Sequence, residues 1–118
     1  MSVDKTRKGD EARRLRKLAG QWLKSKRTAA GLTQKELANR VGLEYYTFVS
    51  QIEGGQGRVP SNLYLVWART LGLDLKDFAK KMLEFYDPHT HHALGFAPTG
   101  AETNHSLKNP SSIGINEN

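Results

Sequence analysis

The chain has 118 residues, no cysteine and a net charge of +6, and 37% of its residues are hydrophobic. The lack of cysteine excludes disulfides, thiolate catalysis and zinc sites with cysteine ligands, and no run of about 18 apolar residues could cross a bilayer. No signal-peptide core follows Met1, so we expect one small cytoplasmic domain with polar tails.

The basic charge is concentrated near the N-terminus. Residues 1–31 hold ten Lys and Arg against three Asp and Glu, a net charge of +7. The net charge is +1 over residues 32–86 and −2 over residues 87–118. Such a basic excess favours a polyanionic partner, whose phosphates would bind with strong salt dependence, although a solvated helix face would have the same composition.

The first 30 residues predict an arm and a helix. Residues 1–9 are polar and lack periodicity, and we expect a flexible basic arm. Apolar residues recur at helical spacing over residues 10–30, which predicts a first helix that ends at Gly31. The residues of this segment expected to contact phosphates are Arg13, Arg14 and Lys17.

Residues 32–53 predict two short helices joined by a tight turn. Thr33 and Glu36 have the capping-box spacing at the start of a helix over about 33–41. Gly42 ends that helix because glycine tolerates a positive φ, and a third helix follows over about 45–54. The inward residues of the pair are Leu37, Ala38, Val41, Val49 and Ile52, which leaves an outward side with Tyr46, Thr47, Ser50 and Gln51. Such a pair forms a helix-turn-helix, whose second helix enters the major groove of DNA.

Two further helices and a tail are expected after this pair. Ser61 is the predicted N-cap of a fourth helix, which ends at Gly72. Asp74 caps a fifth helix, and Pro88 ends any helix that reaches it. Residues 87–118 are rich in Asn, Ser, Thr, Gly and Pro, so we expect a disordered tail that is dispensable for folding.

The segments LTQKELANRVG and SQIEGG resemble the Cro/repressor-type (Xre-like) helix-turn-helix domain of phage repressors, antitoxins and bacterial regulators. The resemblance covers about residues 15–85. The residues on the family's signature positions are Gln34, Ala38, Gly42, Val49 and Ile52. One residue more than the usual spacing separates Gly42 from Val49, and we place it in the turn, among residues 43–45.

The resemblance implies an all-α, five-helix lambda-repressor-like domain over residues 10–86, acting as a transcriptional regulator associated with the nucleoid. Its third helix would read duplex DNA through Tyr46, Thr47, Ser50 and Gln51. The expected contacts to the DNA backbone in this region are Thr33, Gln34, Tyr45 and Arg58. Gln34 would also support the third helix, and Glu53 would have a structural role at the end of it. A homodimer on a near-palindromic site is expected, because one such domain buries too little surface for tight specific binding.

Two other classes of function stay open. The chain could be an antitoxin or anti-regulator with a protein partner, or it could bind DNA or RNA non-specifically through its basic N-terminal segment. Walker, GxGxxG, HExxH and GxSxG motifs are missing, so we expect no enzyme, no catalytic residue and no cofactor. We also expect no metal at His89, His91 and His92, because a disordered tail lacks a second shell to orient ligands. No second domain that could bury an effector is apparent.

Overall fold

A computed structural model describes the backbone of residues 2–97 and the side chains of residues 9–97. Within this part of the chain every regular element is helical, which confirms the expected all-α class. The elements are α1 (Ser2–Ala29), α2 (Gln34–Val41), α3 (Thr47–Glu53), the 3₁₀ turn η1 (Ser61–Leu63), α4 (Tyr64–Leu71), α5 (Leu75–Tyr86) and α6 (Pro88–Ala93). None of the described helices is both long and apolar enough to span a membrane.

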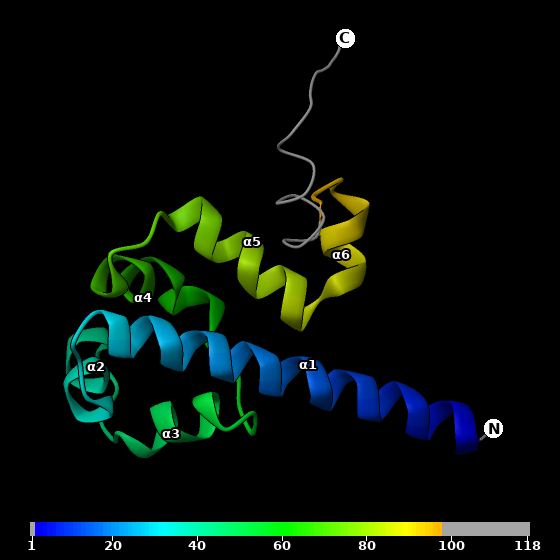
Figure 1. Ribbon diagram of the computed structural model, residues 1–118, viewed down its shortest axis with the longest axis horizontal. Coiled ribbons are helices and arrows are strands. Elements are labelled where there is room, and N and C mark those ends of the chain that lie inside the picture. Colours follow the sequence, from blue (N-terminus) through cyan, green and yellow to red (C-terminus); the bar gives the residue numbers. More distant parts are fainter. Residues whose placement is uncertain (1, 98–118) are drawn as a thin grey trace, which may run out of the picture.

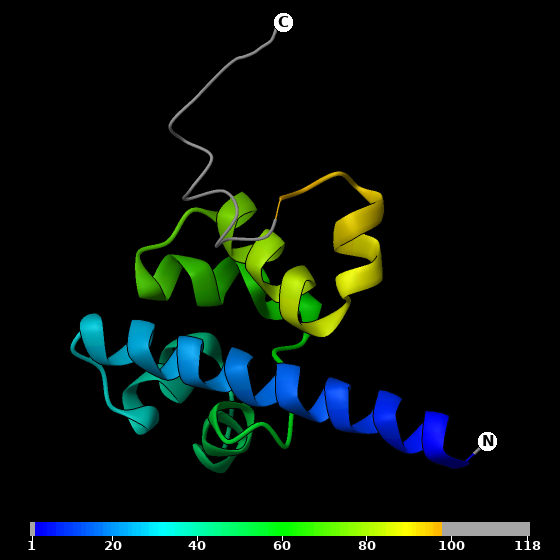
Figure 2. The ribbon, with the colours of Figure 1, turned by 45° about the vertical axis from the view of Figure 1, so that its right-hand side comes forward.

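Helix α1 runs through the middle of the molecule between two groups of helices, which also contact each other through α2 and α4 (Figure 1). Helices α2 and α3 lie on one side of α1, and α4 and α5 lie on the other, with contacts from α1 to both α3 and α5. Helix α6 follows α5 and packs against it. The N-terminal part of α1 extends past the other helices in both ribbon views (Figures 1 and 2).

One apolar core joins these helices. Its largest fully buried side chains include Trp67 on α4 and Phe78 on α5. Trp22 of α1 is half-buried against the core, with its ring centroid 6.1 Å from that of Phe78. Trp67 therefore lies in the core and Trp22 packs against it.

The expected boundary at residue 10 lies inside α1. The helix begins at Ser2, so the prediction of a flexible arm over residues 1–9 was wrong for residues 2–9. The missing apolar periodicity shows only that no other element needs to pack there. Each residue that joins an existing helix forms one more backbone hydrogen bond, which favours extension of α1. The i,i+3 ion pairs of Arg13 with Asp10 and of Arg14 with Glu11 also stabilise its exposed surface.

The tail prediction was also wrong at its start. Asp87 caps α6 by accepting hydrogen bonds from the backbone N–H and the hydroxyl of Thr90, and Pro88 occupies the first turn. Proline favours that place because its fixed φ suits a helix start and no N–H is needed there. His91 is buried, with its ring 5.5 Å from that of Phe96. The folded region thus extends to residue 97, and residues 98–118 lie outside the described residues.

The signals at the ends of α4 and α5 were confirmed in part. Gly72 ends α4 with a φ of 73°, and the side chain of Asp74 caps α5 by accepting from the N–H of Asp77, both as expected. Ser61 is not an α-helical N-cap, because it begins the 3₁₀ turn η1 and α4 starts only at Tyr64. Short 3₁₀ turns are common at the start of α-helices, and local sequence does not separate the two forms.

Candidate nucleic-acid interface

The start and end of α2 follow from local side-chain chemistry. The hydroxyl of Thr33 accepts from the N–H of Glu36 at 3.1 Å, and the Glu36 carboxylate accepts from the N–H of Thr33 at 2.9 Å. These hydrogen bonds hold the pKa of Glu36 below its ordinary value. Gly42 ends α2 in the left-handed conformation, with a φ of 82°. The capping box and the glycine stop are therefore both confirmed.

The packing of α2 against α3 also agrees with the sequence pattern. The five residues expected to face inward are all buried, namely Leu37, Ala38, Val41, Val49 and Ile52. Helix α3 begins at Thr47, two residues later than expected, so residues 42–46 connect the helices. Residues 43–45, where we placed the additional residue, lie in this connection.

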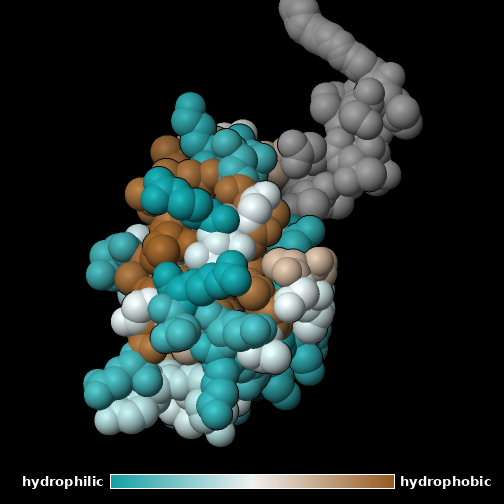
Figure 3. Space-filling view, turned by 90° about the vertical axis from the view of Figure 1, so that its left-hand side faces the viewer, coloured by the Kyte–Doolittle hydropathy of each residue, from teal (hydrophilic) through white to brown (hydrophobic). Residues whose placement is uncertain are grey.

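The exposed residues of α3 and its N-cap are uncharged, and most of them are polar. Tyr46, Thr47, Ser50 and Gln51 are all exposed, as the pattern predicted. The acidic residue of α3, Glu53, is buried. Figure 3 shows the end of the molecule on which α2 and α4 lie, where hydrophobic surface gathers in the upper and middle parts and the lowest part is drawn in teal and pale colours. Helix α3 itself therefore exposes no negative charge.

Phe48 is an exposed residue of α3 that the sequence analysis did not assign. Its side chain is 46% exposed and that of Tyr45 is 58% exposed, with ring centroids 6.3 Å apart. Phe48 and Gln51 both line a hollow of about 250 Å³ beside α3. The sequence holds no clear signal for this exposure, because Phe48 precedes buried Ile52 by four residues and so lies near the same helical face. An exposed phenyl ring can contact the methyl group of thymine.

A buried ion pair fixes the end of α3 to α1. The guanidinium of Arg27 donates from Nε to Glu53 Oε2 at 2.7 Å and from Nη2 to Oε1 at 3.0 Å. Gln34 of α2 donates to the same carboxylate at 3.0 Å, and Arg27 also donates to the carbonyl oxygen of Leu32 at 2.8 Å. Glu53 therefore has the expected structural role, and Gln34 supports α3 as expected. The role of Arg27 was missed.

The backbones of α1 and α3 meet at a glycine. A Cβ atom added at Gly20 would lie 2.2 Å from the carbonyl oxygen of Glu53, which is far inside van der Waals contact. Gly55 follows α3 with a φ of 87°, and a Cβ atom there would lie 2.9 Å from the side chain of Lys17. Only glycine allows both approaches, so the loop after α3 lies directly against α1.

The candidate phosphate contacts of α1 lie on two adjacent faces of the helix. Lys17 is exposed beside the loop after α3, and Arg13 precedes it by one helical turn on the same face of α1. Arg13 pairs with Asp10, and Arg14 pairs with Glu11 on an adjacent face.

Other cations lie close to α3. Arg58 is exposed and its guanidinium lies 5.3 Å from the ring centroid of Tyr86, whose hydroxyl accepts from the N–H of Val59. Lys35, which the sequence analysis did not single out, lies 5.8 Å from the ring centroid of Tyr46. Lys35 thus lies beside the start of α3, and Arg58 lines the 250 Å³ hollow together with Phe48 and Gln51.

Comparison with known proteins does not assign the chain to a family. No model of a known protein family matches it, and no curated protein matches it. Within the described residues no group of three or more His, Cys, Asp or Glu side chains is placed to hold a metal ion. The function is therefore argued from the geometry of α2, α3 and their supports.

Proposed function

We propose that this chain is a sequence-specific regulator that binds duplex DNA through a lambda-repressor-like helix-turn-helix domain. The observation that carries the proposal is the combination of an uncharged, mostly polar exposed side on α3 with a rigid attachment behind it. The attachment is the buried contact of Glu53 with Arg27 and Gln34. A helix that reads bases must keep its position to within a fraction of an ångström, so this support fits a recognition helix.

In this proposal α3 lies in the major groove with its exposed side toward the bases. Gln51 and Phe48 are exposed, and in this arrangement Gln51 pairs with the N6 and N7 edge of adenine while Phe48 contacts a thymine methyl group. The remaining base contacts are Tyr46, Thr47 and Ser50. The contacts to phosphates that set the register are Thr33, Gln34, Tyr45, Arg58, Arg13, Arg14 and Lys17.

A two-fold dimer on a near-palindromic site accompanies the proposal, because two copies of α3 reach successive major grooves about 34–36 Å apart. One domain of this size buries too little surface for tight specific binding, so pairing raises both affinity and specificity.

Selection of bound duplexes from a random pool tests the proposal. We expect the wild-type chain to enrich two inverted half-sites, with strong preference at the positions that α3 contacts. The Gln51→Ala variant should lose preference at one base pair in each half-site. The control is Lys76→Ala, an exposed substitution on α5, across α1 from α3, and it should leave the profile unchanged. Equal binding to all duplexes would reject specific recognition and favour non-specific binding through α1.

A further inference from the structure

A hollow of about 350 Å³ lies where α1, the loop after α3 and the α5–α6 junction meet. Part of its wall is apolar, from Ala12 and Leu15 of α1 and from Phe85 and Pro88 at the junction. The volume is within the range of pockets that hold small molecules, at the lower end of that range. The hollow is therefore large enough for a small ligand with an apolar body.

Two guanidinium groups border the hollow without a carboxylate partner. Arg16 and Arg58 both line it, and neither forms an ion pair or hydrogen bond with another residue between 9 and 97. Tyr86 is half-buried, and burial raises its pKa, whereas the charges of Arg58 and Arg16 act in the opposite direction. Two positive charges thus converge beside an apolar wall.

The acidic residues at the hollow are already bonded elsewhere. Glu11 accepts two hydrogen bonds from the guanidinium of Arg14 at 2.9 and 3.2 Å. Asp87 accepts from both the hydroxyl and the backbone N–H of Thr90, which holds its pKa below the ordinary value. Arg14 thus neutralises Glu11, whereas Asp87 keeps its negative charge, because Thr90 is neutral, and the charge of Arg58 also lowers its pKa. Arg16, Arg58 and Asp87 together leave one net positive charge at the hollow.

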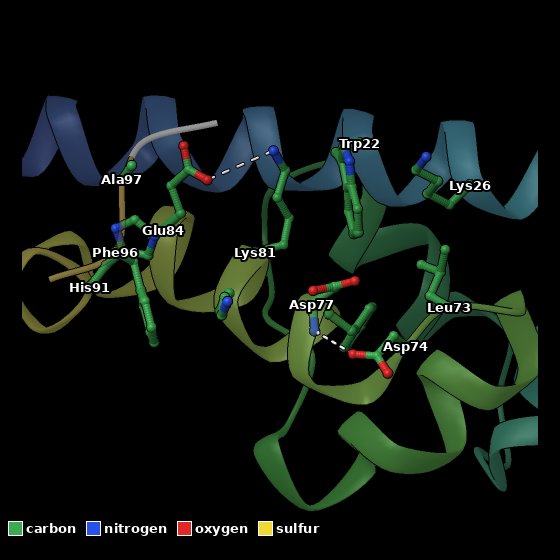
Figure 4. A pocket seen from close by; sticks show the side chains of 12 residues that line it. Trp22, Lys26, Leu73, Asp74, Asp77, Lys81, Glu84, His91, Phe96 and Ala97 are labelled. Atoms are coloured by element: carbon green, nitrogen blue, oxygen red, sulfur yellow. Dashed lines mark hydrogen bonds and ion pairs between the residues drawn. The ribbon is translucent and has the colours of Figure 1, made fainter. Parts of the chain in front are cut away.

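A second hollow, larger than the first, differs in this respect. It has a volume of about 440 Å³ and lies between α1 and the α5–α6 region (Figure 4). Its charged side chains are mixed in sign and contributed by Lys26, Lys80 and Lys81 with Asp74, Asp77 and Glu84. Lys81 and Glu84 form an ion pair there. This balance selects neither an anion nor a cation.

We propose that the 350 Å³ hollow binds a small carboxylate with an apolar body, such as a medium-chain or aromatic acid. The carboxylate lies between the guanidinium groups of Arg16 and Arg58, whose planar forks match its two oxygens. The apolar body covers Leu15 and Phe85. The two parts of the ligand thus match the two parts of the hollow.

Occupation of this hollow should weaken DNA binding, and this step rests on the proposed function. Arg58 also lines the hollow beside α3 that Gln51 lines, so it stands between the ligand and the DNA surface. A guanidinium held by a carboxylate is withdrawn from a DNA phosphate. By thermodynamic linkage, bound DNA must lower the affinity for the ligand by the same factor by which the bound ligand lowers the affinity for DNA.

Titration of octanoate into the full chain without DNA tests the site. We expect saturable binding of octanoate at one site and no comparable binding of octanol. The affinity for octanoate should be about tenfold lower in Arg16→Gln, because this variant loses hydrogen bonds between charged groups. Lys76→Gln, a loss of charge elsewhere on the surface, should bind octanoate like the wild type. Nuclear Overhauser effects between octanoate and the methyl groups of Leu15 locate the ligand in the unmodified chain. Equal binding of octanol and octanoate, or ligand contacts away from Leu15, would overturn the site.

The effect on DNA is measured separately. Saturating octanoate should lower the affinity of the wild type for its selected duplex, and it should have little effect on Arg58→Gln. Octanoate binding without any change in DNA affinity would overturn the coupling. A chain that binds octanoate but no duplex would overturn the proposed function and support the ligand site. A chain that binds DNA but no octanoate would overturn the ligand site and leave the proposed function intact.

Discussion

Removal of the carboxylate charge at Glu53 should be the most costly single change at the α3 support. Glu53→Gln leaves the Arg27 guanidinium buried, with only 7% of the residue exposed, and without a counter-charge. One amide oxygen can replace only one of the two acceptors now 2.7 and 3.0 Å from Arg27, and the amide N–H₂ group would oppose a donor. Breaking a buried pair in this way costs about 3–5 kcal/mol.

That cost is large against the total stability of a small domain. A domain of this kind has a free energy of unfolding of about 5–15 kcal/mol, so the variant should be folded only marginally. Urea unfolding followed by far-ultraviolet circular dichroism measures the change. The control is Glu44→Gln, which removes an exposed carboxylate in the connection between α2 and α3 and should change stability by less than about 0.5 kcal/mol.

A double substitution separates the charge from the packing. Arg27→Met together with Glu53→Met removes both charges, and the pair should cost clearly less than the sum of the two single changes. A loss below about 1 kcal/mol for Glu53→Gln, or additive losses in the double variant, would refute the claim that this ion pair attaches α3 to α1.

Four further predictions follow from local geometry. Gly20→Ala should lower the midpoint of thermal unfolding by forcing α1 from α3, with a cost of at least about 1–3 kcal/mol, and unchanged melting would contradict the close approach. Thr33→Ala should cost about 0.5–2 kcal/mol in urea unfolding, while Thr33→Ser should retain most of the cap. Truncation after residue 97 should preserve stability, whereas truncation after Asp87 should lower it by removing α6, and equal melting of the two chains would show that α6 is not part of the fold. The hydrogen bonds from Thr90 hold the pKa of Asp87 below its ordinary value of 3.8. The capping of α6 should therefore be complete above pH 3.8 and be lost as the pH falls below it, and a nuclear magnetic resonance titration of the α6 amides would measure this loss.

The sequence predicted those parts of the fold that depend on neighbouring residues. Thr33, Glu36 and Gly42 fix the ends of α2 through contacts within one turn, so their spacing is informative by itself. The buried stripe of α2 and α3 follows from helical periodicity in the same way. The outward position of Gln51 follows as well, since two positions after buried Val49 correspond to about 200° around a helix.

Other features depend on contacts that no local pattern contains. Arg27 and Glu53 are 26 positions apart, and only the fold shows that they meet. Pro88 is compatible both with the end of one helix and with the first turn of another, and the cap from Asp87 together with the burial of His91 decides for the second. Three segments that are distant in the sequence line the hollow beside Arg16 and Arg58, so no local sequence pattern predicts it.

The central claim is that α3 reads base edges in the major groove, and replacement of adenine by 7-deazaadenine tests it most directly. This base lacks the N7 acceptor of the major groove and keeps its Watson–Crick pairing. A bidentate pair contributes about 1–3 kcal/mol, and replacement of the adenine that Gln51 selects should remove a measurable part of this free energy from wild-type binding. The same replacement should not weaken the binding of Gln51→Ala further. Wild-type affinity that is unchanged by the replacement at every adenine of the selected site would contradict this reading of α3.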